Sequence, residues 1–133
     1  KKMVAEKHLS DEKIYFTGYL DEAKIAMLLR ESAGHVLFSN YETQGCVILE
    51  ALACGTPSIS SDVEAVREAV HEQNIILVDV GDESKLAAAM ESVTNGFYSY
   101  SPEKLSRHIQ STYSYEKVNH LLNDMYKSAI ENP

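Results

Sequence analysis

Short apolar runs that alternate with helical patterns constrain the fold of this chain most strongly. Four such runs cover residues 14–16, 35–38, 58–60 and 75–78. Each is followed by a segment in which apolar side chains recur at helical spacing. Because a helix between two strands returns the chain to the same end of the sheet, this alternation predicts parallel strands. We expect an α/β fold, a Rossmann-like parallel sheet flanked by helices.

Capping and breaking residues mark the ends of the expected helices. Asp21 can cap a helix that stops before Gly34, and Gly55 can end a helix that begins near Gly45. Ser114 precedes an amphipathic closing helix and can cap it. The remaining helices are expected at residues 63–70, 82–94 and 102–111, and the closing helix at residues 115–130.

The charge balance argues against several classes of partner. The chain has 133 residues, 12 of them basic and 20 acidic, and a formal net charge of −8. Such an excess of carboxylates attracts neither nucleic acid nor anionic lipids, so we expect no nucleic acid partner and no direct membrane binding by this segment. No apolar run approaches the roughly 20 residues that cross a bilayer, and the first residues lack a secretory signal. These features predict one domain of a cytoplasmic protein.

The residues that most often bind metals or form disulfides show no matching pattern. Cys46 and Cys54 fall on one expected helix, about 12 Å apart at a rise of about 1.5 Å per residue, which is too far for a disulfide. We expect both to be buried apolar residues. The five histidines show no metal-ligand spacing, so no metal site is expected. Asp62 fits a helix cap and Glu68 a solvated helix face.

An almost entirely apolar helix carries a single charge, the carboxylate of Glu50. Every other side chain from Gly45 to Cys54 is apolar or absent, which predicts a helix enclosed on most sides. A buried carboxylate needs strong hydrogen-bond partners, and either an Arg or Lys side chain or a ligand can supply them. Glu42, eight positions earlier, can equally be a solvated acid near the positive end of the helix. Each glutamate is therefore a candidate with a structural alternative.

The position of these residues in a parallel sheet favours a phosphate-containing ligand. Ligands of such sheets bind outside the carboxyl ends of the strands, and residues 42–45 connect the second expected strand to the Glu50 helix. The free N–H groups at the start of that helix favour a phosphate, and Gly45 would let it approach the backbone. Glu50 can accept hydrogen bonds from a vicinal diol such as a ribose.

The same segment resembles a known family signature. Residues 39–58 read Ser-Asn-Tyr-Glu-Thr-Gln-Gly-Cys-Val-Ile-Leu-Glu-Ala-Leu-Ala-Cys-Gly-Thr-Pro-Ser. The pattern Glu42-x7-Glu50, with Gly45 inside it, resembles retaining nucleotide-sugar glycosyltransferases of the GT-B fold, most closely glycosyltransferase family four, the group 1 type. Further segments resemble family motifs in the same order, at residues 14–20, 74–78, 82–90 and 113–116.

The resemblance implies a function for the whole chain. Residues 1–133 would be part of the C-terminal, donor-binding domain of a larger two-domain enzyme. That enzyme would transfer a sugar from a nucleoside-diphosphate sugar to a glycan or lipid-linked acceptor held by an N-terminal domain, in polysaccharide or glycoconjugate biosynthesis. The family works without a protein-bound metal, and no other cofactor is implied.

The resemblance also assigns roles to individual residues. Glu42 would be the catalytic candidate, in contact with hydroxyls of the donor sugar. Glu50 would bind the ribose hydroxyls, while the backbone N–H groups of Gly45 and Cys46 would lie near the diphosphate. The residues beside the base would be Gly18, Tyr19 and Leu20.

Two features of the sequence depart from the family pattern. Where members usually have Gly-Gly-x-x-Glu near the donor sugar, residues 64–68 read Glu-Ala-Val-Arg-Glu, and Thr-Gln replaces Gly-Phe at residues 43–44. The family's diphosphate-binding Arg and Lys, and the two central strands of its sheet, precede the segment that this sequence covers. The strand at 14–16 would then lack a neighbour, and the fold would be truncated at its N-terminal strands. We therefore expect an isolated chain that is inactive and that rearranges, pairs edges as a homo-oligomer, or receives these strands from elsewhere.

Two alternatives stay open at this point. A degenerate, non-catalytic nucleotide-binding or regulatory module of the same fold would explain the lost glycine pair. A different GT-B enzyme, such as a nucleotide-sugar epimerase, or an unrelated phosphate-binding α/β domain is the third possibility. The Glu42-x7-Glu50 pattern argues against that third reading.

Overall fold

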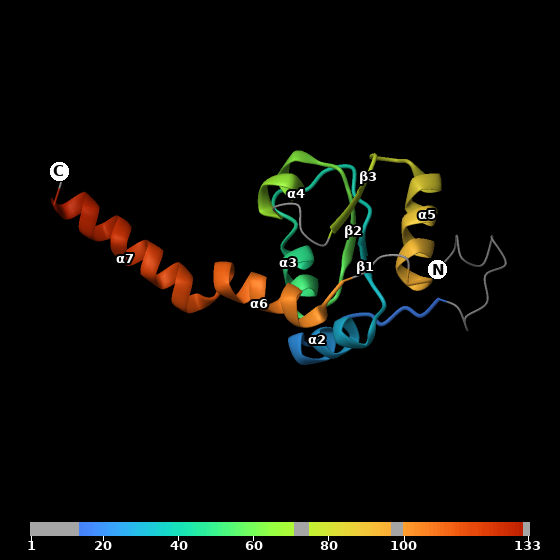
Figure 1. Ribbon diagram of the computed structural model, residues 1–133, viewed down its shortest axis with the longest axis horizontal. Helices are drawn as coiled ribbons and strands as arrows, with labels where there is room; N and C mark the ends of the chain where they lie inside the picture. Colours follow the sequence, from blue (N-terminus) through green and yellow to red (C-terminus); the bar gives the residue numbers. More distant parts are fainter. Residues whose placement is uncertain (1–13, 71–74, 97–99, 132–133) are drawn as a thin grey trace.

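Three parallel strands form the sheet of this protein, whose computed structural model describes residues 14–70, 75–96 and 100–131. The strands are β1 (His35–Leu37), β2 (Ser58–Ser61) and β3 (Ile75–Val78), in the order β1-β2-β3. Val36 pairs with Ile59, and Ile59 pairs with Ile76 on its other side. Figure 1 shows the sheet between helices on both faces, so the predicted α/β class is confirmed.

The helices begin and end within a few residues of the predicted positions. They are α2 (Glu22–Glu31), α3 (Cys46–Ala53), α4 (Glu64–Ala69), α5 (Glu83–Thr94), α6 (Pro102–Tyr113) and α7 (Tyr115–Glu131). The Asp21 side chain accepts a hydrogen bond from the Lys24 N–H at 2.9 Å, and Ser114 accepts one from the Lys117 N–H at 3.2 Å. Both predicted caps are therefore confirmed.

Apolar side chains form two clusters, one on each face of the sheet. The first joins α3, α4 and α6 and consists of Ile48, Leu52, Val66, Val70, Leu105 and Ile109. The second joins β2 and β3 to α5 and consists of Ile59, Val78, Ala89 and Val93. The central strand β2 is buried along its whole length, as expected for a strand covered by helices on both faces.

The predicted strand at residues 14–16 is not formed. These residues have no strand assignment, and the side chain of Tyr15 is 86% exposed. A strand needs a neighbour to pair with, and among the described residues β1 pairs only with β2. The apolar pattern predicted a strand, but within the described residues this segment pairs with neither edge strand of the sheet, β1 or β3. Asn74, which begins one family-like segment, lies outside the described residues.

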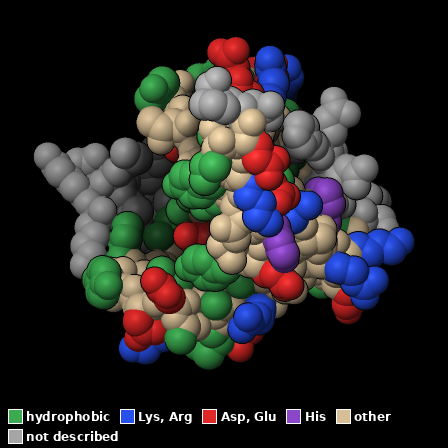
Figure 2. Space-filling model, turned by 90° about the vertical axis from the view of Figure 1, so that its left-hand side faces the viewer, with side chains coloured by type: hydrophobic (Ala, Val, Ile, Leu, Met, Phe, Trp, Pro, Cys, Tyr) green, Lys and Arg blue, Asp and Glu red, His purple; other side chains and the backbone are tan. Residues whose placement is uncertain are grey.

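The closing helix α7 extends away from the sheet (Figure 1). None of its residues is buried, although its apolar side chains recur at helical spacing. The end of the molecule that carries α7 shows hydrophobic side chains at the surface beside charged ones (Figure 2). Within the described residues, no helix is both long enough and apolar enough to span a bilayer.

Candidate functional site

A left-handed glycine begins α3, the helix that carries Glu50. Gly45 has φ +65°, and a Cβ built on it would lie 3.3 Å from Ile48 Cδ1 and 3.4 Å from Val66 Cγ2. The Ile48 N–H donates to the Gly45 carbonyl at 2.9 Å. Among the described residues, no protein acceptor is found for the N–H of Cys46 or Val47. The start of α3 thus leaves two donors for water or a ligand. The left-handed conformation and the close packing at position 45 both favour glycine. The approach of a phosphate to Gly45 stays a prediction.

A cavity of ≈ 630 Å³ lies beside the segment that precedes α3. Its lining residues are Tyr41, Glu42, Thr43, Val63, Glu64, Ala65 and Glu68. Glu42 follows β1, whereas Glu64 follows β2 as the first residue of α4. Because β1 and β2 are parallel neighbours, their carboxyl ends bring these two segments together. The structure therefore places Glu42 in a cavity where a ligand of this fold class is expected.

A smaller cavity of ≈ 210 Å³ adjoins the first and shares Thr43, Ala65 and Glu68 with it. It adds Gln44 and Leu49, so the concave surface continues toward α3. Thr43 and Gln44 replace a Gly-Phe pair of the family pattern, and both are exposed. Thr43 lines both cavities, whereas Gln44 lines only the smaller one.

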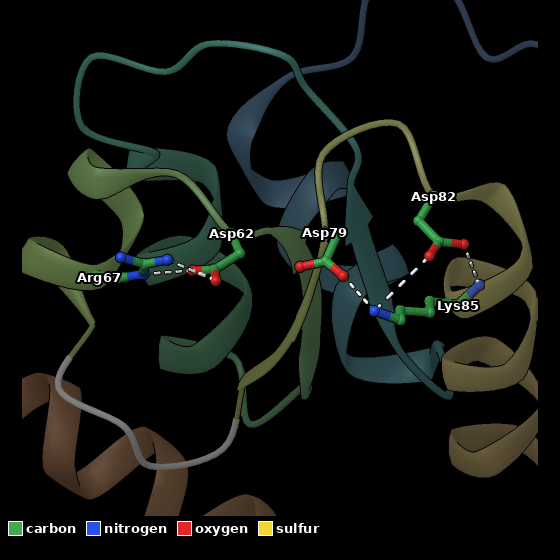
Figure 3. Close-up of polar contacts among 5 residues, drawn as sticks. All are labelled: Asp62, Arg67, Asp79, Asp82 and Lys85. Carbon is green, nitrogen blue, oxygen red and sulfur yellow. Dashed lines mark hydrogen bonds and ion pairs between the residues drawn. The ribbon is translucent and has the colours of Figure 1, made fainter.

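Three carboxylates line the larger cavity, and the nearest guanidinium is held by another acid. Arg67 forms an ion pair with Asp62, in which Nη2 donates to Oδ2 at 2.6 Å (Figure 3). The Arg67 side chain holds the pKa of Asp62 below its usual value, and Asp62 raises the pKa of Arg67. Asp62 is therefore a partner of Arg67 and not the predicted cap of α4, which is Val63. Arg67 does not form an ion pair with Glu42, Glu64 or Glu68.

The end of β3 carries a similar arrangement. Lys85 pairs with Asp79, and its Nζ also lies 3.8 Å from Asp82 Oδ2 (Figure 3). Asp79 raises the pKa of Lys85 by accepting its hydrogen bond. The cations of α4 and α5 shown in Figure 3 are thus engaged by aspartates that follow β2 and β3. Both pairs are exposed, so each contributes little to stability.

Glu50 lies on the outer face of α3, which corrects the prediction of an enclosed helix. Its side chain is exposed, and it lines neither of the two cavities. The helix buries Ile48, Ala51 and Leu52, whereas Val47 is 44% exposed. An apolar composition predicted burial on most sides, but the sheet, α4 and α6 cover only one face. Among the described residues, no ion pair satisfies Glu50, so the structural alternative of pairing with Arg or Lys is not realised.

The three residues predicted to contact the base lie outside the two cavities. Gly18 has φ +67°, Tyr19 is 97% exposed and Leu20 is half-buried, just before α2. None of the three lines either cavity, so the structure does not bring them to Glu42. Their contact with a base stays a prediction.

Two cysteines lie at the two ends of α3, and a histidine lies on the strand before it. Both thiols are free, but Cys46 is exposed and Cys54 is only half-buried, so the expectation of two buried cysteines is wrong for Cys46 and only partly met by Cys54. Its Sγ donates to Gln44 Oε1 at 3.6 Å. His35 Nδ1 lies 3.0 Å from Ser58 Oγ, and burial lowers the pKa of His35. His35 therefore joins β1 to β2 and lines neither cavity.

The residue pattern predicted Glu68 on a solvated helix face, whereas the family resemblance placed residues 64–68 near the donor sugar without naming a site residue among them. The structure makes Glu64, Ala65 and Glu68 walls of the larger cavity. A signal for this was available, because neighbouring parallel strands place the segments that follow them at one edge of the sheet. The segment after β2 was therefore a candidate for the same site as Glu42.

The sequence of this chain is similar to those of known glycosyltransferases. Residues 1–95 match the model of the family described as "Glycosyl transferases group 1". The chain belongs to this family. A glycogen synthase of Mycobacterium tuberculosis is 39% identical over 90 residues, which are 67% of this chain and 22% of that protein. A phosphatidyl-myo-inositol mannosyltransferase of Mycobacterium leprae is 38% identical over 82 residues, 59% of this chain and 22% of that protein.

A solved structure supports the same assignment at the level of the fold. Sucrose-phosphate synthase from Thermosynechococcus elongatus superposes with a TM-score of 0.83 at 27% identity, over 99% of this chain and 34% of that one. The group 1 chain thus has the architecture of part of a GT-B glycosyltransferase. It spans between 22% and 34% of the length of these three proteins.

Proposed function

We propose that this group 1 chain is the nucleotide-sugar-binding part of a retaining glycosyltransferase. The donor would be a nucleoside-diphosphate sugar, and the acceptor, a glycan or a lipid-linked molecule, would be held by another domain of the polypeptide. The observation that carries the proposal is the position of Glu42, in a cavity at the carboxyl ends of β1 and β2. Family membership supports a sugar donor as the ligand of that cavity.

The residues of the site suit the parts of such a donor. Glu42 can accept hydrogen bonds from hydroxyls of the sugar in the larger cavity. The unpaired N–H groups of Cys46 and Val47 can donate to the diphosphate, and Gly45 holds the backbone that presents them. Glu50 is exposed, so its carboxylate is open to the ribose 2′ and 3′ hydroxyls. We expect the reaction to use neither a metal nor another cofactor, and the protein to act in the cytoplasm.

Among the described residues, no Lys or Arg lines the two cavities beside the start of α3. Arg67 and Lys85 are already paired with aspartates, and the cavity walls carry three carboxylates. A leaving diphosphate needs positive charge or strong donors to stabilise it. We therefore expect negligible sugar transfer by the 133-residue chain alone, and transfer only by a longer polypeptide that contains it.

A titration and a product analysis test this proposal. The complete polypeptide is titrated calorimetrically with UDP-glucose, GDP-mannose and ADP-glucose, and we expect one of them to bind. Incubation of that donor with a candidate acceptor, followed by NMR of the product, should give the anomeric configuration of the donor. Failure of all three to bind would overturn the donor-binding role. An inverted product would contradict retention.

One observation favours a second candidate, a nucleotide-binding module without catalysis. Glu64 stands where the family usually has a glycine and adds a carboxylate to the sugar cavity. If the site no longer holds a sugar, nucleoside diphosphates should bind as tightly as nucleotide sugars. A donor that binds more tightly than its diphosphate, and is consumed, would exclude this second candidate.

A further inference from the structure

The larger cavity, the proposed site of the donor sugar, has acidic side chains in its wall. Glu42, Glu64 and Glu68 are three of the seven described residues that line it, and none of these seven is basic. Arg67 lies on α4 with Glu64 and Glu68, forms its ion pair with Asp62, and interacts with Glu64 through space without an ion pair. Among the described residues, the cavity carboxylates take part in no ion pair. Ion pairing therefore does not neutralise the three carboxylates of this cavity.

We propose that Glu64 restricts the donor to sugars without a negative charge, so that uronic acid donors are rejected. This inference rests on the proposed function, because it concerns the sugar end of the same donor. The diphosphate, itself an anion, would lie outside the larger cavity, near the unpaired N–H groups at the start of α3. The sugar is then the part of the donor that enters the space between Glu42 and Glu64.

The carboxylate of a uronate would be repelled by the cavity glutamates and would lose hydration without gaining a cation as partner. A neutral hexose presents hydroxyls that can donate to the carboxylates of Glu42 and Glu64, whereas a uronate adds a third carboxylate with no cation to pair with. Like charges brought together in a partly enclosed site weaken binding more than they do in open water. A glycine in place of Glu64 would remove one of the opposing charges.

Glu64 can also act on the stability of α4, and the experiment has to distinguish this effect from donor specificity. It is the first residue of α4, where an acidic side chain favours the positive end of the helix. A loss of that effect would change stability and would weaken all donors alike. A role in specificity changes the ratio of affinities for charged and neutral sugars, which a purely structural role leaves unchanged.

The test compares matched donors that differ only in the oxidation of the sugar. Dissociation constants of the complete polypeptide are measured for UDP-glucose against UDP-glucuronate and for GDP-mannose against GDP-mannuronate. The variants are Glu64→Gln, which keeps the size of the side chain, and Glu91→Gln as a control. Glu91 is exposed on α5, which packs on the opposite face of the sheet, so its substitution removes an equal charge away from the cavity.

For the nucleotide that binds, we expect the uronate donor to be at least about tenfold weaker than the neutral donor. Glu64→Gln should reduce that ratio about threefold or more, and Glu91→Gln should leave it unchanged. Equal affinities in the wild type, or an unchanged ratio in Glu64→Gln, would overturn the inference while leaving donor binding established. If neither the neutral nor the charged donors bind, the proposed function fails and this inference fails with it.

Discussion

The two faces of α3 share one short apolar sequence but have opposite surroundings. On the inner face, Ile48 and Leu52 are 0% and 1% exposed and pack against α4 and α6. On the outer face, Val47 is 44% exposed and Glu50 is open to solvent. The hydrophobic content of a helix therefore indicates how much it can bury, and its neighbours decide which face is buried. The only charged residue of α3 lies on the face that a ligand can reach.

The largest expected effect is on the inner face. Leu52→Ala should lower the free energy of unfolding by about 2 to 5 kcal/mol, because it leaves a cavity between α3, α4 and α6. Urea denaturation followed by circular dichroism measures the change. A loss below about 1 kcal/mol would show that this face is not part of a close-packed core.

A smaller effect is expected where α3 begins. Gly45→Ala should cost about 1 to 3 kcal/mol, from the left-handed conformation and from the contact of the new methyl group with Ile48 and Val66. Gly81→Ala is the matched control, since Gly81 has φ +78° and no atom within 4 Å of a built Cβ. The difference between the two variants isolates the crowding. Equal losses would mean that only the backbone conformation requires Gly45.

The smallest expected effect is on the outer face. Val47→Ala should change the free energy of unfolding of the 133-residue chain by no more than about 0.5 kcal/mol, because the side chain is partly exposed and the substitution suits a helix. The same urea denaturation gives the value. A loss as large as that of Leu52→Ala would show that another part of the molecule covers this face in solution, and would remove the contrast between the two faces.

Much of the fold could be predicted from local patterns. Asp21, Gly55 and Ser114 marked helix ends correctly because capping depends on a few adjacent residues. The strand at 14–16 was wrong because pairing depends on a partner strand, which no local pattern supplies. The closing helix was placed correctly, but its amphipathic pattern could not show that none of its residues would be buried.

The candidate site could be predicted only in part. Residues 42–45 were predicted at the ligand side of a parallel sheet because they follow a strand and precede a helix, and Glu42 lines the larger cavity whereas Gly45 lines neither; their roles stay predictions. Only the family resemblance put residues 64–68 near the donor sugar, and neither Glu64 nor Glu68 was named as a site residue; the pairing of β1 with β2 brings both to the cavity. The exposure of Glu50 followed from the arrangement of α4 and α6, which its own helix sequence does not encode.

The most direct test of the central claim is the affinity of the complete polypeptide for its preferred nucleotide after Glu50→Ala. Titration calorimetry with UDP, GDP and ADP identifies that nucleotide, and Glu91→Ala is the control. We predict a loss of about 10- to 100-fold for Glu50→Ala, the loss expected for charged hydrogen bonds, with a melting temperature close to that of the wild type. Unchanged affinity for every nucleotide would contradict the assignment of the outer face of α3 to the ribose.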